Sequence, residues 1–174
     1  MEIVYILQII TICITALTFV VNVLITLITN KQKNYNEIIT NNRIEFMLRN
    51  RDNATQFIAE ARYLIFKLKN GECSIDLKPL YLSYEQICMA LKPYNSIDNE
   101  IITAGKNVLE LAEESVLKGH LNDSLLDAVN KFARLFNIYD DADWKFIKQQ
   151  FNSTHKKSAD FDKICEEIKI KYND

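Results

Sequence analysis

The sequence predicts an all-α protein, with an N-terminal transmembrane helix followed by a cytoplasmic helical bundle of five or six helices. Three observations lead to this prediction. The segment from Ile3 to Thr29 contains no charged residue. Beyond it, apolar residues recur at the helical spacings of three and four. Glycine occurs three times and proline twice, which gives too few turn signals for an all-β fold.

The uncharged N-terminal segment is long enough to cross a bilayer. As a helix it would extend about 40 Å, whereas the hydrocarbon core of a membrane is roughly 30 Å thick. A cleaved signal peptide would begin with basic residues, but the early side-chain charge here is Glu2, and Asn30-Lys31-Gln32 follows the apolar stretch. We therefore predict that residues 1–30 form a retained membrane anchor.

Basic residues follow the span and none precedes it. They are Lys31, Lys33, Arg43, Arg49 and Arg51. The positive-inside rule then places the N-terminus outside and the C-terminal domain in the cytoplasm, at the cell membrane. Residues 31–43 are expected to form a basic juxtamembrane linker or a continuation of the helix, and residues 44–174 a cytoplasmic helical domain.

Hydrogen-bonding side chains within the span are spaced three or four residues apart. They are Gln8, Thr11, Thr15, Thr18, Asn22, Thr26 and Thr29. At about 100° per residue they fall within an arc of roughly 80°, so they occupy one helix face, which we call the polar seam. Threonine can bond to a carbonyl of its own helix, which explains each threonine but not their alignment. We predict that the polar seam contacts a second copy and makes the protein a homo-oligomer. The alternative is that the polar seam lines a narrow pore.

A second set of positions, after the span, follows the heptad spacing of a coiled coil. These positions are Ile44, Met47, Ala54, Ile58, Ala61, Ile65 and Leu68. Arg51 interrupts the repeat. The set would form a stalk seam if it packed against a second chain. The competing interpretation is the first helix of an ordinary bundle, because Phe46, Phe57 and Leu64 widen the apolar face beyond a two-residue seam.

Helix start and stop signals divide the rest of the chain. They lie at Pro79 and Lys92-Pro93, at Ser96 as an N-cap and Lys118-Gly119, at Asn122 or Asp123, at Asp140 or Asp141, and at Ser158. At Asp140-Asp141 either the preceding helix continues or a new helix begins. The first case gives five helices in the bundle and the second gives six. The late apolar stripes predict that Phe132, Phe136, Trp144 and Ile147 are buried.

No catalytic, cofactor-binding or metal-binding residue is predicted. Three isolated glycines cannot form a phosphate-binding loop, and the four cysteines have no metal-ligand spacing. His120 and His155 each lack a second ligand at the required distance along the chain. Asp141 and Asp143 match two positions of a calcium loop, but Phe146 stands where that loop requires glycine. We therefore expect a protein that is not an enzyme.

The charge balance of the chain bears on its partners. The formal net charge is −2 and the sequence pI is about 5.8. Nucleic acid is therefore not expected as a partner, because phosphate binding needs a clustered basic surface. The expected partners are the lipid bilayer, a second copy of the chain and a cytoplasmic protein.

Three short stretches resemble a known group of proteins. They are Asn42-Arg43-Ile44-Glu45-Phe46, Leu91-Lys92-Pro93 and Asp143-Trp144-Lys145. In this order they resemble a loose group of uncharacterised small bacterial proteins with a single-pass membrane anchor and a helical domain. Phe46 departs from the group, in which tryptophan is expected at that position. The resemblance implies an architecture and assigns no activity.

Together these patterns predict a membrane-anchored helical interaction or sensor module that self-associates through the polar seam. The alternative is a membrane-permeabilising effector of the defence or toxin type, controlled by its cytoplasmic domain. Dye leakage or membrane depolarisation on overexpression would distinguish the effector from the module.

Overall fold

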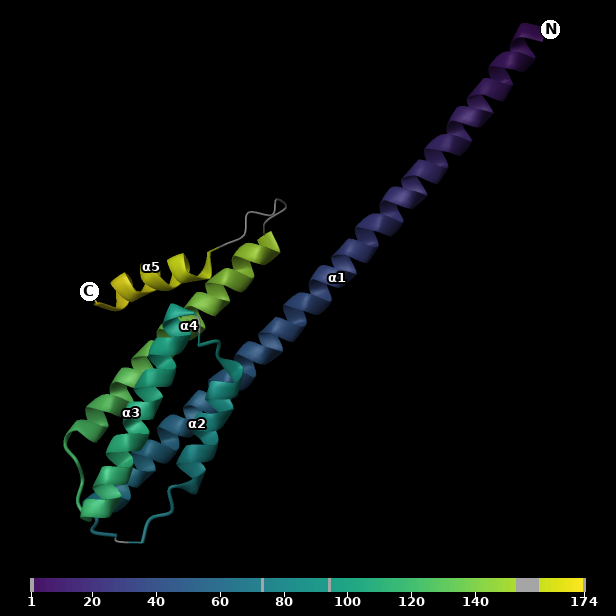
Figure 1. Cartoon of the computed structure of the whole chain (residues 1–174). Helices are drawn as coiled ribbons and strands as arrows, with labels where there is room; N and C mark the ends of the chain where they lie inside the picture. Colours follow the sequence, from purple (N-terminus) through teal and green to yellow (C-terminus); the bar gives the residue numbers. More distant parts are fainter. Residues whose placement is uncertain (1, 73, 94, 153–159, 174) are drawn as a thin grey trace. The chain divides into compact units, whose positions relative to one another are not determined.

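The computed structural model describes residues 2–72, 74–93, 95–152 and 160–173. Within these ranges every regular element is an α-helix, and no strand occurs. The helices are α1 (Glu2–Lys69), α2 (Lys78–Ala90), α3 (Ser96–Lys118), α4 (Ser124–Asn152) and α5 (Phe161–Asn173) (Figure 1). The all-α prediction is confirmed. The chain divides into two compact units, Met1–Asn42 and Arg43–Asp174, and α1 contributes residues to both.

The first unit is the N-terminal part of α1. Its segment Ile10–Lys31 is 22 residues long and apolar enough to cross a membrane, and none of it is buried against other parts of the chain. Large apolar side chains such as Phe19 and Leu24 stand exposed along it. A helix with an apolar surface on most sides is typical of one surrounded by protein or by lipid. The prediction of an N-terminal helix able to span a membrane is therefore supported by length and composition.

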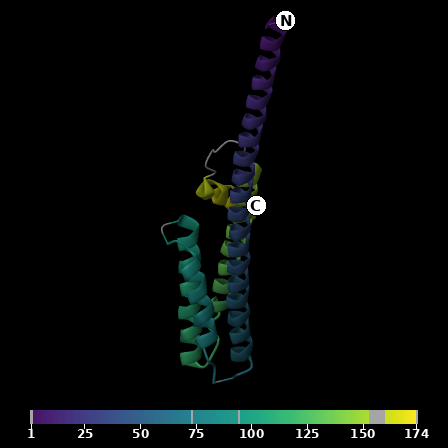
Figure 2. The same ribbon diagram turned by 90° about the vertical axis from the view of Figure 1, so that its right-hand side faces the viewer.

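The second unit is a bundle built from the C-terminal part of α1 and from α2 to α5. Helix α4 packs against α3 and α5, and α3 also packs against α2. Figure 2 shows α3 and α4 running beside the C-terminal part of α1. Helix α4 continues through Asp140 and Asp141 instead of restarting there. In the described residues the bundle therefore has five helical segments, the smaller of the two predicted numbers.

A row of aromatic rings runs through the core of the bundle. Its members, in order of contact, are Tyr84, Phe57, Phe132, Phe136, Tyr139, Phe161 and Phe146, with successive ring centroids 4.8 to 6.3 Å apart. The closest pair is Phe57 and Phe132, and both side chains are fully buried. Because the row joins α1, α2, α4 and α5, it ties together helices that are distant in sequence.

Helix α2 approaches α3 closely at Gly105. A Cβ atom on Gly105 would lie 2.7 Å from the ring of Tyr84. The Tyr84 hydroxyl donates a hydrogen bond to the carbonyl of Ile102, at 3.0 Å. Glycine is therefore required for this contact, since any side chain would displace the Tyr84 ring.

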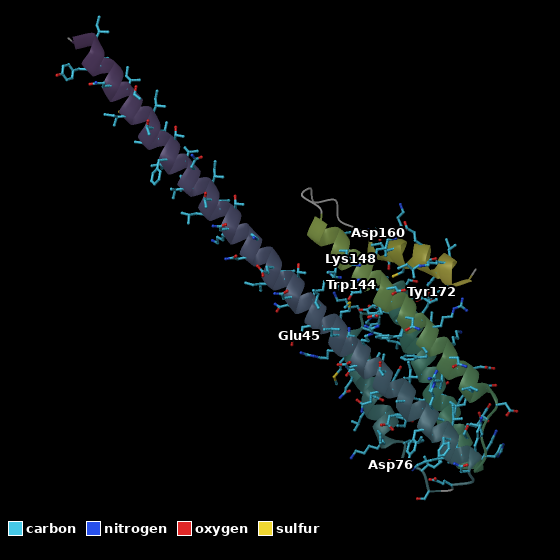
Figure 3. All side chains as sticks on the ribbon, turned by 180° about the vertical axis from the view of Figure 1, so that it is seen from behind. Glu45, Asp76, Trp144, Lys148, Asp160 and Tyr172 are labelled. Carbon is cyan, nitrogen blue, oxygen red and sulfur yellow. The ribbon has the colours of Figure 1, made fainter. Side chains whose placement is uncertain are left out.

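The predicted core residues of α4 are buried with one exception. Phe132, Phe136 and Ile147 are buried as predicted, but Trp144 is 43% exposed, so its predicted burial is wrong. At this turn the side of α4 that faces the core carries Asp143 and Ile147. Trp144 follows Asp143 by one residue, so its side chain is rotated by about 100° from that of Asp143 and points away from the core. The Lys148 ammonium lies 4.9 Å from the Trp144 ring centroid, and both side chains extend from α4 (Figure 3).

The positions predicted as a stalk seam lie inside the bundle. Five of them are buried: Met47, Ala54, Ala61, Ile65 and Leu68. Ile58 is partly buried against the core, and Ile44 is half-buried. Contacts within one chain therefore account for these side chains, which is the arrangement expected of the first helix of a bundle. Their use between two chains stays a prediction.

Candidate functional site

The polar seam occupies the exposed surface of α1 within the first unit. Four threonine hydroxyls donate hydrogen bonds to the carbonyl four residues earlier, each at 2.8 Å: Thr15 to Thr11, Thr18 to Ile14, Thr26 to Asn22, and Thr29 to Ile25. These bonds use the hydroxyl protons inside the helix, and the hydroxyl oxygens still have acceptor capacity. The four threonines can therefore enter an apolar medium without an unpaired donor.

The two amides of the polar seam differ from these threonines. The side chains of Gln8 and Asn22 are exposed, and neither has a hydrogen-bond partner among the residues that the structure describes. Each amide carries two donor hydrogens and an acceptor oxygen. An unpaired amide in an apolar medium costs several kcal/mol, on the order of 2 to 7. Asn22 lies within Ile10–Lys31 and Gln8 lies two residues before it, so these amides are the candidates for an external hydrogen-bond partner if the helix lies in a membrane.

A second polar site lies inside the bundle, where α1, α3 and α4 meet. The Arg43 guanidinium donates two hydrogen bonds to Asp143 Oδ1, from Nη2 at 3.1 Å and from Nε at 3.3 Å. The Asp143 side chain is buried, whereas the Arg43 side chain is 35% exposed. The guanidinium also lies 4.3 Å from the ring centroid of Phe146. Arg43 thus joins the start of the second unit to α4 by an ion pair and a cation–π contact.

Asp98 lies in the first turn of α3 and is 3% exposed. Its Oδ2 accepts hydrogen bonds from the backbone N–H of Lys92, at 2.8 Å, and from Asn95 Nδ2, at 3.2 Å. These two bonds hold the connection between α2 and α3 against the start of α3. The other carboxylate oxygen, Oδ1, is buried and has no hydrogen-bond partner in the described part of the chain.

Asn50 and Tyr139 complete this site. Asn50 is 3% exposed. Burial raises the pKa of Tyr139, and the charges of Asp143 and Asp98 raise it further, whereas a side-chain hydrogen bond with Asn50 and the charge of Arg43 lower it. Asn50 thus neighbours the Tyr139 hydroxyl, and the two carboxylates and Arg43 act on it through their charges. We call Arg43, Asn50, Asp98, Tyr139 and Asp143 the buried cluster.

The carboxylates of the buried cluster are held in an environment that disfavours charge. Burial raises the pKa of Asp98 above its usual range, against the opposing effect of the Lys92 and Asn95 hydrogen bonds. Burial also raises the pKa of Asp143, and the charge of Arg43 opposes this. A neighbouring carboxyl, Asp140, has its own cation in Arg51, with 3.5 Å between Oδ2 and Nη2.

Sequence reasoning found the polar seam but missed the buried cluster. The sequence pattern places Asp143 in an incomplete calcium loop and gives no signal for Asp98. The usable signal was the interruption of the apolar repeat of α1 at Asn50-Arg51. Arg51 points outward to Asp140, and Asn50 is the polar side chain that enters the core.

The histidines and cysteines considered for chemistry are not members of either site. His120 is exposed, with Nδ1 3.2 Å from the Lys118 carbonyl oxygen, and His155 lies outside the described residues. Burial raises the pKa of Cys165 to about 12, which keeps this thiol protonated. Among the described residues, no group of three or more His, Cys, Asp or Glu side chains is placed to hold a metal ion.

Comparison with protein-family models, with curated proteins and with solved structures found no match. The function must therefore be inferred from the polar seam and from the bundle themselves.

Proposed function

We propose that the protein is a membrane-anchored helical module that self-associates through the polar seam and presents its bundle to a protein partner in the cytoplasm. The observation that carries this proposal is the pair of unpaired, exposed amides, Gln8 and Asn22, on one face of an apolar helix. The proposal assigns binding and signalling to the chain, and no catalysis.

Hydrogen-bond accounting supports self-association. In a bilayer Thr15, Thr18, Thr26 and Thr29 have their protons bonded within the helix, whereas Gln8 and Asn22 need partners from elsewhere. Interhelical hydrogen bonds between such side chains contribute about 0.6 to 2 kcal/mol each. The two amides are about 21 Å apart along the helix axis. A partner that meets both must therefore run along most of the span, and a second copy supplies the same groups at the same levels.

The bundle offers exposed apolar side chains for a cytoplasmic partner. Tyr63 and Phe66 of α1 and Leu82 and Met89 of α2 are exposed. These two helices are neighbours, since Phe57 of α1 contacts Tyr84 of α2 with 5.9 Å between ring centroids. Aromatic residues and methionine are enriched at protein interfaces, so we propose that a partner binds exposed side chains of α1 and α2.

Replacement of both amides by leucine is expected to weaken self-association. Leucine keeps the span apolar, so the variant Gln8→Leu/Asn22→Leu should still fractionate with membranes. It removes the side chains that need an external hydrogen-bond partner, so less dimer or higher oligomer should form. Crosslinking of the full chain within membranes, followed by gel electrophoresis, measures this directly.

The matched control is a double leucine substitution on other faces of the same helix, Ile10→Leu/Val21→Leu. This variant should give the crosslinking pattern of the parent. An unchanged pattern in the Gln8 and Asn22 variant would show that the polar seam does not drive assembly. Equal losses in both double variants would show that the associating face lies elsewhere.

The proposed orientation predicts the behaviour of C-terminal fusions. Lys31, Lys33 and Arg43 follow the span and should remain on the cytoplasmic side. A green fluorescent protein fused after Asp174 should therefore fluoresce, and an alkaline phosphatase fused there should be inactive. An active phosphatase together with a dark fluorescent fusion would place the bundle outside and overturn the cytoplasmic part of the proposal.

A further inference from the structure

We propose that the buried cluster is a proton-binding site at Asp98, and that the bound proton stabilises the bundle. The inference goes beyond the proposed function, because it concerns the bundle alone and holds whether or not the polar seam associates. If the protein is a sensor, the signal that this site would detect is the pH around the bundle.

The first step is the state of the hydrogen-bonding atoms around Asp98. Its Oδ2 is satisfied by Lys92 and Asn95, whereas Oδ1 is buried without a partner among the described residues. A proton on Asp98 Oδ1 would remove the negative charge from a buried oxygen that accepts no hydrogen bond from the described residues.

The second step is a count of charges. Asp98 and Asp143 are both buried, and each raises the pKa of Tyr139 through its negative charge. Arg43 is the cation of this group, and both of its hydrogen bonds go to Asp143. With both carboxyls ionised, the buried cluster therefore holds one uncompensated negative charge. Protonation of Asp98 removes that charge and leaves the ion pair of Arg43 and Asp143 intact.

The third step considers the other titratable groups that face Asp98 from each helix. Burial keeps Tyr139 of α4 and Cys165 of α5 protonated near neutral pH. Lys169 of α5 is paired with Glu100 and Glu166, with Nζ–Oε1 distances of 2.7 and 3.0 Å. Asp143 of α4 acts on Asp98 through its negative charge, and Arg43 of α1 pairs with Asp143. Arg51 of α1 points outward and pairs with Asp140. From the α2–α3 connection, Lys92 faces Asp98 with its backbone N–H and its positive charge. In the described part of the chain, Asp98 is thus the buried carboxyl without a cation paired to it.

The sign of the pH dependence follows from the raised pKa of Asp98. The folded state takes up the proton at a higher pH than the unfolded chain does. The resulting stabilisation is complete at pH values below the pKa of Asp98 in the unfolded chain. It is lost as the pH rises through the pKa of Asp98 in the folded chain. Mild acidification should therefore stabilise the bundle through Asp98, whereas an exposed and paired carboxylate such as Glu167 acts in the opposite direction.

The test compares the full chain with Asp98→Asn in detergent micelles between pH 5 and pH 8, with the thermal midpoint followed by circular dichroism. Asparagine keeps an acceptor for Lys92 and Asn95 and adds an N–H donor, so it imitates the protonated acid. At pH 8 the thermal midpoint of the variant should be higher than that of the parent. The expected difference is about 3 to 5 °C for each pH unit by which folding raises the pKa of Asp98. The difference should close toward pH 5. An equal difference at every pH, or a variant less stable throughout, would overturn the proposal.

A control variant makes the test specific. Asp52→Asn makes the same change at an exposed position of α1, and at pH 8 it should not raise the thermal midpoint above that of the parent. A gain in Asp52→Asn equal to that in Asp98→Asn would overturn the proposal, because the effect would then not depend on burial.

Discussion

Truncation of Phe132 to alanine is expected to lower the free energy of unfolding by about 3 to 5 kcal/mol. Phe132 is fully buried, its ring centroid lies 4.8 Å from that of Phe57, and its side chain also approaches Gly105. Its removal would leave a cavity bordered by α1, α3 and α4, which a bundle of long helices cannot easily close. Chemical unfolding of the full chain in detergent, followed by circular dichroism, measures the loss.

The matched comparison is Trp144→Ala on the same helix. Trp144 is 43% exposed and contacts the Lys148 ammonium rather than the aromatic row. Its truncation should cost about 1 kcal/mol, because less apolar surface leaves a buried environment. Equal losses for the two variants would contradict the position of Phe132 at the centre of the bundle.

Replacement of Arg43 by methionine is expected to lower the free energy of unfolding by about 2 to 3 kcal/mol near neutral pH. Removal of one partner from a buried ion pair typically costs about 3 to 5 kcal/mol. We reduce that range because the Arg43 side chain is 35% exposed and water screens part of the interaction. Methionine keeps a side chain against Phe146, so most of the loss would come from the uncompensated charge of Asp143. Denaturant unfolding at several pH values measures it.

The pH dependence of this loss distinguishes charge from packing. Without Arg43 the pKa of Asp143 should rise further, because Arg43 is the group that lowers it. The loss should therefore be largest at neutral pH and should shrink as Asp143 becomes protonated. The control Arg49→Met breaks an exposed pair with Glu45, 3.3 Å apart, and should cost about 0.5 kcal/mol or less. A loss in Arg43→Met that stays constant with pH would mean that the ion pair contributes little.

Local signals in the sequence predicted the helix boundaries well. Pro79 lies at the start of α2, and Gly119 ends α3 in the left-handed conformation, with φ of 67°. Ser96 is the first residue of α3 rather than its N-cap, a role that falls to Asn95. Such signals act through neighbouring residues, so a single sequence is enough to read them.

Signals that depend on contacts between helices were misread. The carboxylates of Asp140 and Asp141 resemble caps, but in the folded chain they bind Arg51 and the Tyr172 hydroxyl. For the same reason the sequence could not predict the buried cluster, because Arg43 and Asp143 are 100 residues apart. The polar seam was predictable because all its members belong to one helix and its spacing alone defines the face.

The bonds that the seam threonines make within their own helix bear on how permanent an assembly would be. In a bilayer, Thr15, Thr18, Thr26 and Thr29 would be tolerated in a lone chain, since their protons are already bonded. Two amides per chain then set the strength of association, at a few kcal/mol in total. Interactions of that size are reversible, so the fraction of paired chains would follow their surface density in the membrane. A cell could thus switch the assembled state by changing the number of copies it makes.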